Sequence, residues 1–207
     1  NYGGQSQTWK SSVKPHLRAV AAVEEFLPGI AERLGDPNFT KSLAPSEASL
    51  VRFMEEPREH LVDTINALDE TLRAALILVY VHRGAFNFEA ADGPAIDAVA
   101  ELTGISRSRV LDSFAELKGS FLKASGTGPV TVWSFAHPTI ADALTEILRE
   151  KPHMMAALLR GATIDTILTG FMSEAAGAIR DALSIPANLN DTLVARLADT
   201  PDELELN

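Results

Sequence analysis

The segment that most restricts the fold of this chain runs from residue 93 to residue 135, where two helix-like stretches precede two strand-like stretches. Apolar residues recur at helical spacing in "GPAIDAVAELTG", which ends at Gly104, and again in "RSRVLDSFAELKG", for which Ser106 is the expected N-cap. Two helices joined by a short turn with glycine are typical of a helix-turn-helix. The runs "SFLKA" and "PVTVWSF" flank the turn "SGTG", which predicts a hairpin.

A third helix is expected just before this segment. The stretch "DETLRAALILVYVHRG" has Asp69 as its N-cap and Gly84 at its end, and the strand-like piece "AFNF" follows it. Helix, helix, helix and hairpin is the order of a winged helix. Trp133 is expected to pack within the wing. The residues expected to form the core are Leu76, Ile96, Val110, Phe114 and Val132.

Helices are also predicted on both sides of the winged helix. Before it, Pro28 should break or kink the helix "KPHLRAVAAVEEFLPGIAERLG", and the helix "APSEASLVRFMEEP" has Ser46 as N-cap and Pro57 as its end. After it, "PTIADALTEILREKP" begins with Pro138 in its first turn. Three further short helices are expected in "HMMAALLRGATIDTILTGF", "SEAAGAIRDAL" and "NLNDTLVARLAD".

The predicted fold class is therefore mainly α. A helical bundle over residues 1–68 precedes a winged helix-turn-helix with a small β-hairpin over 69–150, and further short helices occupy 151–207.

Composition and motifs exclude several classes of function. The 207 residues include no cysteine, which excludes zinc-thiolate sites and cysteine nucleophiles and fits a cytoplasmic protein. No apolar run approaches the roughly 18–20 residues of a membrane span. The five histidines lack ligand spacing, so no metal site is expected, and the phosphate-binding, dinucleotide, zinc-protease and hydrolase motifs are absent. We therefore expect no catalysis from this chain alone.

One interpretation of the winged helix is a DNA-binding transcriptional regulator, because residues at the start of a recognition helix reach base edges. The candidate DNA contacts are Arg107, Arg109, Lys118 and Lys123. Asp112 and Glu116 lie on the same helix, however, and the formal net charge of −10 opposes binding to phosphates. A helical adaptor without a ligand of its own is a further alternative.

A second interpretation comes from the junction "WSFAHPTI". A helical bundle, a winged helix and then "F-x-H-P-[ST]-[IF]" at the start of a helix resemble the C-terminal part of a prokaryotic STAND-class signalling NTPase, related to NACHT and NB-ARC proteins. The resemblance covers roughly Lys14 to Leu148 and includes "SVKPHL" and "EEPREHLVDTINALDETLRAALILVYVHRG". The matching residues of the short motif are Phe135, His137, Pro138, Thr139, Ile140 and Leu144.

The resemblance implies a conformational switch. In this family the winged-helix histidine contacts the β-phosphate of ADP and holds the resting state, which would make His137 a nucleotide sensor. Pro15, with Pro28 as a competing candidate, would pack near the adenine. From the residues alone, His137 could equally cap the helix or bond to the wing, and either proline could simply start or kink a helix.

The phosphate-binding loop and the acidic Walker B strand of the family are absent, and we expect them upstream of this chain. ADP or ATP would bind with that NTPase core, which is the expected partner, and no cofactor is expected in the chain itself. The longer protein would be an ATPase that forms homo-oligomers when activated, in prokaryotic defence or stress signalling. No membrane partner is expected, and the net charge argues against nucleic acid.

Overall fold

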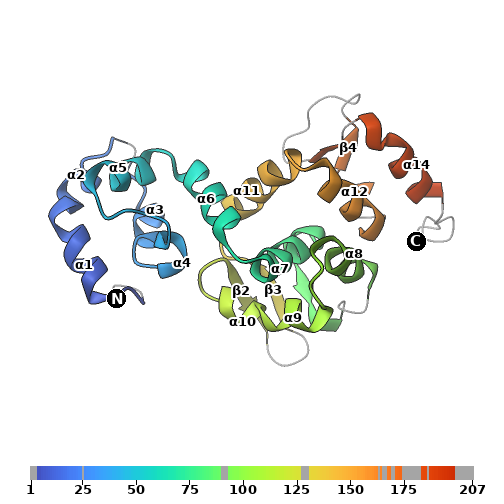
Figure 1. Ribbon diagram of the computed structural model, residues 1–207, viewed down its shortest axis with the longest axis horizontal. Helices are drawn as coiled ribbons and strands as arrows, with labels where there is room; N and C mark the ends of the chain where they lie inside the picture. The colour runs from blue at the N-terminus through green and yellow to red at the C-terminus, as the bar shows by residue number, and fades with distance from the viewer. Residues whose placement is uncertain are drawn as a thin grey trace. The chain divides into compact units, whose positions relative to one another are not determined.

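The computed structural model of the chain is mainly helical and contains a small three-stranded antiparallel sheet (Figure 1). It describes residues 4–24, 26–89, 93–126, 131–162, 164, 167–168, 171–173, 183–185 and 187–198. We expected boundaries after residues 68 and 150. The compact units are Asn1–Leu68 and Asp69–Asn207, so the second unit continues through residue 150.

The first unit is built from short helices around one apolar core. The elements are α1 (Gln7–Val13), the 3₁₀ helix η1 (Lys14–His16), α2 (Leu17–Ala21), α3 (Pro28–Arg33), α4 (Pro37–Thr40), α5 (Glu47–Glu55) and α6 (Pro57–Ala67). The core residues are Val13, Val20, Ile30, Leu34, Leu50, Phe53 and Met54.

The helix expected over residues 14–35 is broken before Pro28, which was one of the two expected effects of this proline. The break begins earlier than expected, because the chain leaves helical geometry after Ala21, and Pro28 begins α3. Proline is suited to the first position of a helix because the missing N–H has no partner there. Two members of the expected apolar stripe lie outside the core as a result, with Leu17 45% exposed and Leu27 54% exposed.

Helix boundaries at capping residues were predicted more accurately. The side chain of Ser46 accepts a hydrogen bond from the backbone N–H of Ser49 at 3.3 Å and begins α5, as expected. The α5 helix ends at Glu55, and Pro57 is the first residue of α6. Proline stops one helix and starts the next within three residues.

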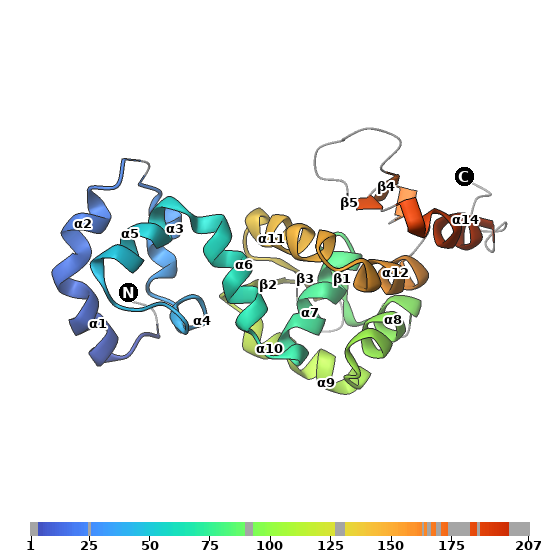
Figure 2. The ribbon, with the colours of Figure 1, turned by 45° about the horizontal axis from the view of Figure 1, so that its top comes forward.

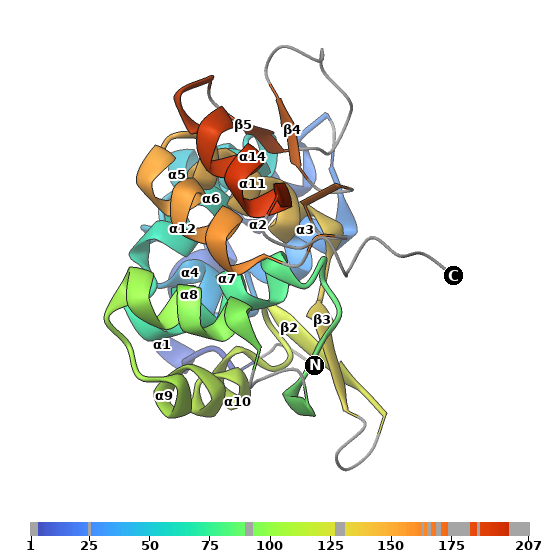
Figure 3. The same cartoon turned by 90° about the vertical axis from the view of Figure 1, so that its right-hand side faces the viewer.

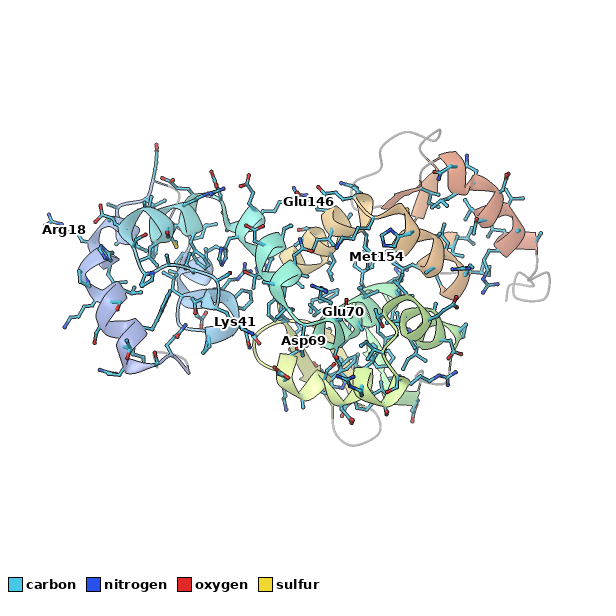
Figure 4. The ribbon with its side chains drawn as sticks, in the orientation of Figure 1. Arg18, Lys41, Asp69, Glu70, Glu146 and Met154 are labelled. Carbon is cyan, nitrogen blue, oxygen red and sulfur yellow. The ribbon has the colours of Figure 1, made fainter. Side chains whose placement is uncertain are left out.

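The second unit begins with a helix that is buried on nearly all sides. The elements are α7 (Glu70–Val81), β1 (Phe86–Asn87), α8 (Pro94–Thr103), α9 (Arg107–Asp112), α10 (Phe114–Leu117), β2 (Leu122–Ser125) and β3 (Val132–Phe135). Asp69 caps α7 through its side chain, which accepts from the N–H groups of Thr71 and Leu72, and Figure 4 labels Asp69 and Glu70 at this start. Helices α8, α9, α10 and α11 and strand β3 all pack against α7.

The three strands form an antiparallel sheet in the order β1-β3-β2. Strands β2 and β3 lie side by side as the predicted hairpin (Figure 3). Phe86 pairs with Trp133, and Leu122 pairs with Phe135. Residues 127–130, between β2 and β3, lie outside the described residues.

Four of the five expected core residues are buried: Leu76, Ile96, Val110 and Phe114. Val132 is only half-buried, which contradicts the prediction. Successive side chains of a strand point to opposite faces, and on β3 the buried face belongs to Trp133, which is 8% exposed. The Trp133 ring meets the ring of Phe114 edge-on at a centroid distance of 5.3 Å, so the expectation that Trp133 belongs to the core is confirmed.

The helix expected from Arg107 to Lys118 is interrupted. It divides at Ser113 into α9 and α10, and the hydroxyl of Ser113 donates to the carbonyl of Val110 at 2.7 Å. Serine competes with the backbone for such bonds and interrupts helices in this way. Ser106 stands at the N-cap position, but its side chain makes no capping bond.

The remaining elements of the second unit are α11 (Pro138–Arg149), α12 (Pro152–Gly161), β4 (Phe171–Ser173), β5 (Leu183–Ile185), η5 (Ala187–Leu189) and α14 (Asn190–Ala198). Helix α12 lies beside α8 and also contacts α11 and α14 (Figure 2).

The helices expected in this last part are partly confirmed. Helices α12 and α14 correspond to the first and third of the predicted segments, whereas β4 and β5 form a parallel pair where helix was expected. Pairing between distant strands supplies backbone hydrogen bonds that local periodicity does not reveal. Most of the middle segment, residues 174–182, lies outside the described residues.

Candidate functional site

The junction between β3 and α11 places His137 at the N-cap of a twelve-residue helix. Its backbone is extended, with φ −145° and ψ 143°, and Pro138 is the first helical residue, as predicted. The imidazole Nδ1 accepts a hydrogen bond from the backbone N–H of Thr139 at 3.3 Å, and the Thr139 hydroxyl lies 2.9 Å from the same atom. His137 therefore caps α11, which was one of its expected roles.

The capping bond also assigns the proton of the His137 ring. A backbone N–H can only donate, so Nδ1 must carry a lone pair and the neutral ring must carry its proton on Nε2. His137 is exposed, and among the described residues no hydrogen bond to Nε2 is present. The side chain thus offers one Nε2–H donor to a molecule that approaches the junction.

The backbone amides at the start of α11 are already occupied. Pro138 has no N–H, Thr139 donates to the His137 ring, and Ile140 donates to the His137 carbonyl at 3.1 Å. A helix N-terminus usually attracts negative charge through free amides as well as through its dipole. In the structure, the polar hydrogen left for an anion comes from the imidazole.

Pro15 belongs to the first unit, whereas His137 belongs to the second. Pro15 lies in the first turn of η1 and is exposed. Pro28, the competing candidate, begins α3. Both prolines occupy helix starts, which is the structural role considered for them from the sequence.

The four candidate DNA contacts are all exposed. Arg107 forms an ion pair with the carboxylate of Asp97, and Nη2 of Arg109 donates to the hydroxyl of Thr71 at 3.4 Å. Lys118 follows α10, and Lys123 lies on β2.

Acidic side chains interrupt this basic surface. Asp112 on α9 and Glu116 on α10 are also exposed, and Asp97 neutralises one of the two arginines. The positive charge needed for a phosphate backbone is therefore discontinuous over these elements.

The sequence reasoning missed Thr139 as a contact of His137. The sequence "HPT" places a hydroxyl residue two positions after the histidine, which was the available signal. The described residues contain no group of three or more His, Cys, Asp or Glu side chains arranged to hold a metal ion. Among the same residues, no helix combines the length and the apolar character needed to cross a membrane.

Comparisons with protein-family models, curated proteins and solved structures found no match to the chain. A proposal about function must therefore start from the residues of the chain itself.

Proposed function

We propose that this chain is the regulatory, nucleotide-sensing part of a STAND-like signalling NTPase, in which residues 69–150 form a winged helix. The order α7, β1, α8, α9, α10, β2, β3 and the sheet order β1-β3-β2 support the winged helix. The helical first unit before it and the motif at His137 after it support the family assignment.

The observation that carries the proposal is the exposed Nε2–H donor of His137 at the start of α11. In the resting protein this group donates a hydrogen bond to a β-phosphate oxygen of ADP held by the NTPase core. A hydrogen bond to a charged partner contributes about 1.5–3 kcal/mol. Loss of this contact would release the winged helix from the core and permit oligomerisation.

The position of His137 suits a removable contact. The ring is fixed by the cap rather than buried in the core, so the fold does not depend on the phosphate. Pro15 has a smaller role in the proposal: its exposed ring, at the start of η1, would contact the adenine. The chain itself supplies no phosphate-binding loop, so ADP and ATP bind through the core, and catalysis of ATP hydrolysis belongs there. We place the protein in the cytoplasm, in prokaryotic defence or stress signalling.

Two substitutions of His137 separate sensing from capping. Serine is a good N-cap residue but lacks the reach of an imidazole, whereas alanine removes both the cap and the donor. In the protein with its NTPase core, we expect His137→Ser and His137→Ala both to lose ADP faster, by roughly ten- to a hundredfold, and to oligomerise spontaneously.

Thermal melting supplies the control for this pair. Replacing an N-cap residue with alanine lowers stability by about 0.5–2 kcal/mol, so His137→Ala should melt at a lower temperature than His137→Ser. If the serine variant retains ADP like the wild type and only the alanine variant changes, His137 is a helix cap and the sensor proposal is wrong.

A DNA-binding regulator is the second candidate, favoured by the exposure of all four basic residues on and after α9. The Asp97–Arg107 ion pair and the exposed acidic residues of α9 and α10 make it the weaker one.

A further inference from the structure

Two groups of Thr139 meet one atom of His137. The backbone N–H of Thr139 lies 3.3 Å from Nδ1, and the hydroxyl oxygen lies 2.9 Å from it. The shorter contact is the one that depends on the identity of residue 139, because any residue except proline would supply the backbone N–H.

The direction of the hydroxyl bond follows from its neighbour. Since the N–H already donates to Nδ1, this nitrogen is an acceptor, and the hydroxyl must donate to it as well. Both bonds are satisfied only when the proton of the neutral ring is on Nε2. In the other tautomer the backbone N–H would lose its acceptor, whereas the hydroxyl bond would reverse, with Nδ1–H donating to the Thr139 oxygen.

The backbone around Thr139 restricts the same pair. Pro138, which lies between the two residues, has a fixed φ and therefore restricts how the backbone places the histidine and threonine side chains. In this geometry the His137 ring reaches Thr139, two residues later in the chain. Threonine is β-branched and has few χ1 rotamers, so its hydroxyl is held near Nδ1 at a small entropic cost.

We propose that Thr139 is a positioning residue: its hydroxyl orients the ring of His137 so that the backbone N–H of the same residue can donate to Nδ1 and select the Nε2–H tautomer. Under the proposed function, on which this use of the tautomer rests, Thr139 thereby presents the donor to the phosphate.

The tautomer can be measured on this chain without a nucleotide. Long-range ¹H–¹⁵N spectra at about pH 8.5, where model histidines are neutral, distinguish protonated from unprotonated ring nitrogens. In the wild type we expect His137 to be protonated on Nε2. Thr139→Val has the same shape without the hydroxyl, and it should change the ratio of the two tautomers about two- to tenfold. Thr139→Ser should restore most of the wild-type spectrum.

His60 supplies an internal reference in the first unit. One of its ring nitrogens, Nε2, lies 2.7 Å from the carbonyl oxygen of Phe39 and must donate to it, so the His60 signals should be the same in all variants. A wild-type His137 protonated on Nδ1, or identical His137 spectra in the wild type and Thr139→Val, would overturn the inference.

A second measurement, ADP retention in the protein with its NTPase core, distinguishes this inference from the proposed function. Faster ADP loss in Thr139→Val, with recovery in Thr139→Ser, supports both. If the tautomer changes but His137→Ser retains ADP, the proposed function fails and the positioning role stands. If His137→Ser loses ADP while Thr139→Val retains it despite the altered tautomer, the link between positioning and sensing is wrong.

Discussion

Gly161, the last residue of α12, lies so close to Ala98 of α8 that a side chain on the glycine would overlap the Cβ of the alanine. The same added Cβ would lie 3.0 Å from the carbonyl oxygen of Pro94. These are backbone and Cβ atoms, which cannot swing aside as the end of a long side chain can. The contact explains how α12 packs directly against α8.

We predict that Gly161→Ala destabilises the second unit. Alanine is the better helix former by about 0.8–1.0 kcal/mol, but overpacking of a close contact costs typically 1–3 kcal/mol. The overlap with Ala98 should outweigh the gain in propensity, and denaturant unfolding followed by helical circular dichroism would measure the net loss.

Two controls accompany this variant. Gly29 lies in α3, and no atom of the described residues is within 4 Å of an added Cβ, so Gly29→Ala should be neutral or stabilising by up to about 1 kcal/mol. Combining Gly161→Ala with Ala98→Gly removes the overlapping atom and should recover part of the lost stability. Equal stability of Gly161→Ala and the wild type would show that α12 can move away from α8 without cost.

The hydrogen bond between Tyr80 and Thr145 gives the second prediction. The two oxygens are 2.9 Å apart and join α7 to α11. Thr145 donates its own proton to the Ala141 carbonyl, so Tyr80 must be the donor between them. Tyr80→Phe should lower the free energy of unfolding by about 0.5–1.5 kcal/mol, because it leaves the Thr145 oxygen without this donor.

A double-mutant cycle with Thr145→Val tests whether this loss belongs to the pair. If the bond accounts for it, the two substitutions together should cost less than the sum of the separate effects. Strict additivity would mean that the bond contributes nothing, and that Tyr80 acts through the packing of its ring.

The caps show how far sequence alone could predict this fold. Asp69 and Ser46 accept hydrogen bonds from amides of the first helical turn, and Pro138 lacks the N–H that would have no partner there. Such local interactions can be predicted from neighbouring residues. The same holds for the hairpin, whose strands are close in sequence. Gly104, in the left-handed conformation with φ 67°, likewise ends α8 where it was expected.

The errors arose where distant residues decide the structure. The burial of Trp133 in preference to Val132 depends on which face of β3 meets α10, and the pairing of β4 with β5 joins residues 171–173 to residues 183–185. At the candidate site, the sequence predicted that His137 would lie directly before a helix that begins at Pro138. The occupied amides of α11 and the choice of tautomer needed atomic positions.

His82 gives a prediction about pH. It is the C-cap of α7, its Nε2 is buried with no hydrogen-bond partner among the described residues, and burial lowers the pKa of its imidazole. The favourable effect of a helix C-terminus on a cation is therefore outweighed by desolvation. Because the unfolded chain then binds the proton more tightly, stability should be constant above the ordinary histidine pKa of about 6.5 and fall as the pH drops through the folded-state value.

Substituting this histidine isolates its contribution. His82→Gln cannot take up a proton in this range, so its stability should fall less between about pH 6.5 and pH 5 than that of the wild type. His153→Gln, which changes an exposed histidine of α12, is the matched control. If the stability of the wild type and of His82→Gln depends on pH in the same way, the pKa of His82 does not change on folding.

The last prediction concerns DNA. The broken basic surface of α9, α10 and β2 predicts only weak, salt-sensitive binding to duplex DNA at about 0.15 M salt. Reversing Arg109 and Lys123 to glutamate should weaken that binding only modestly, and by no more per residue than the reversal of an exposed arginine elsewhere on the chain. Arg18→Glu, at an exposed arginine of α2 in the first unit, is the matched charge control (Figure 4).

A DNA-binding regulator would behave differently. Its binding would be tight, and the reversal at Arg109 and Lys123 would abolish it. The slope of log affinity against log salt concentration would fall by about one for each phosphate contact removed. Fluorescence anisotropy over a salt series measures both quantities, and tight binding lost only in the α9 and β2 variants would replace the nucleotide-sensing proposal with the DNA-binding one.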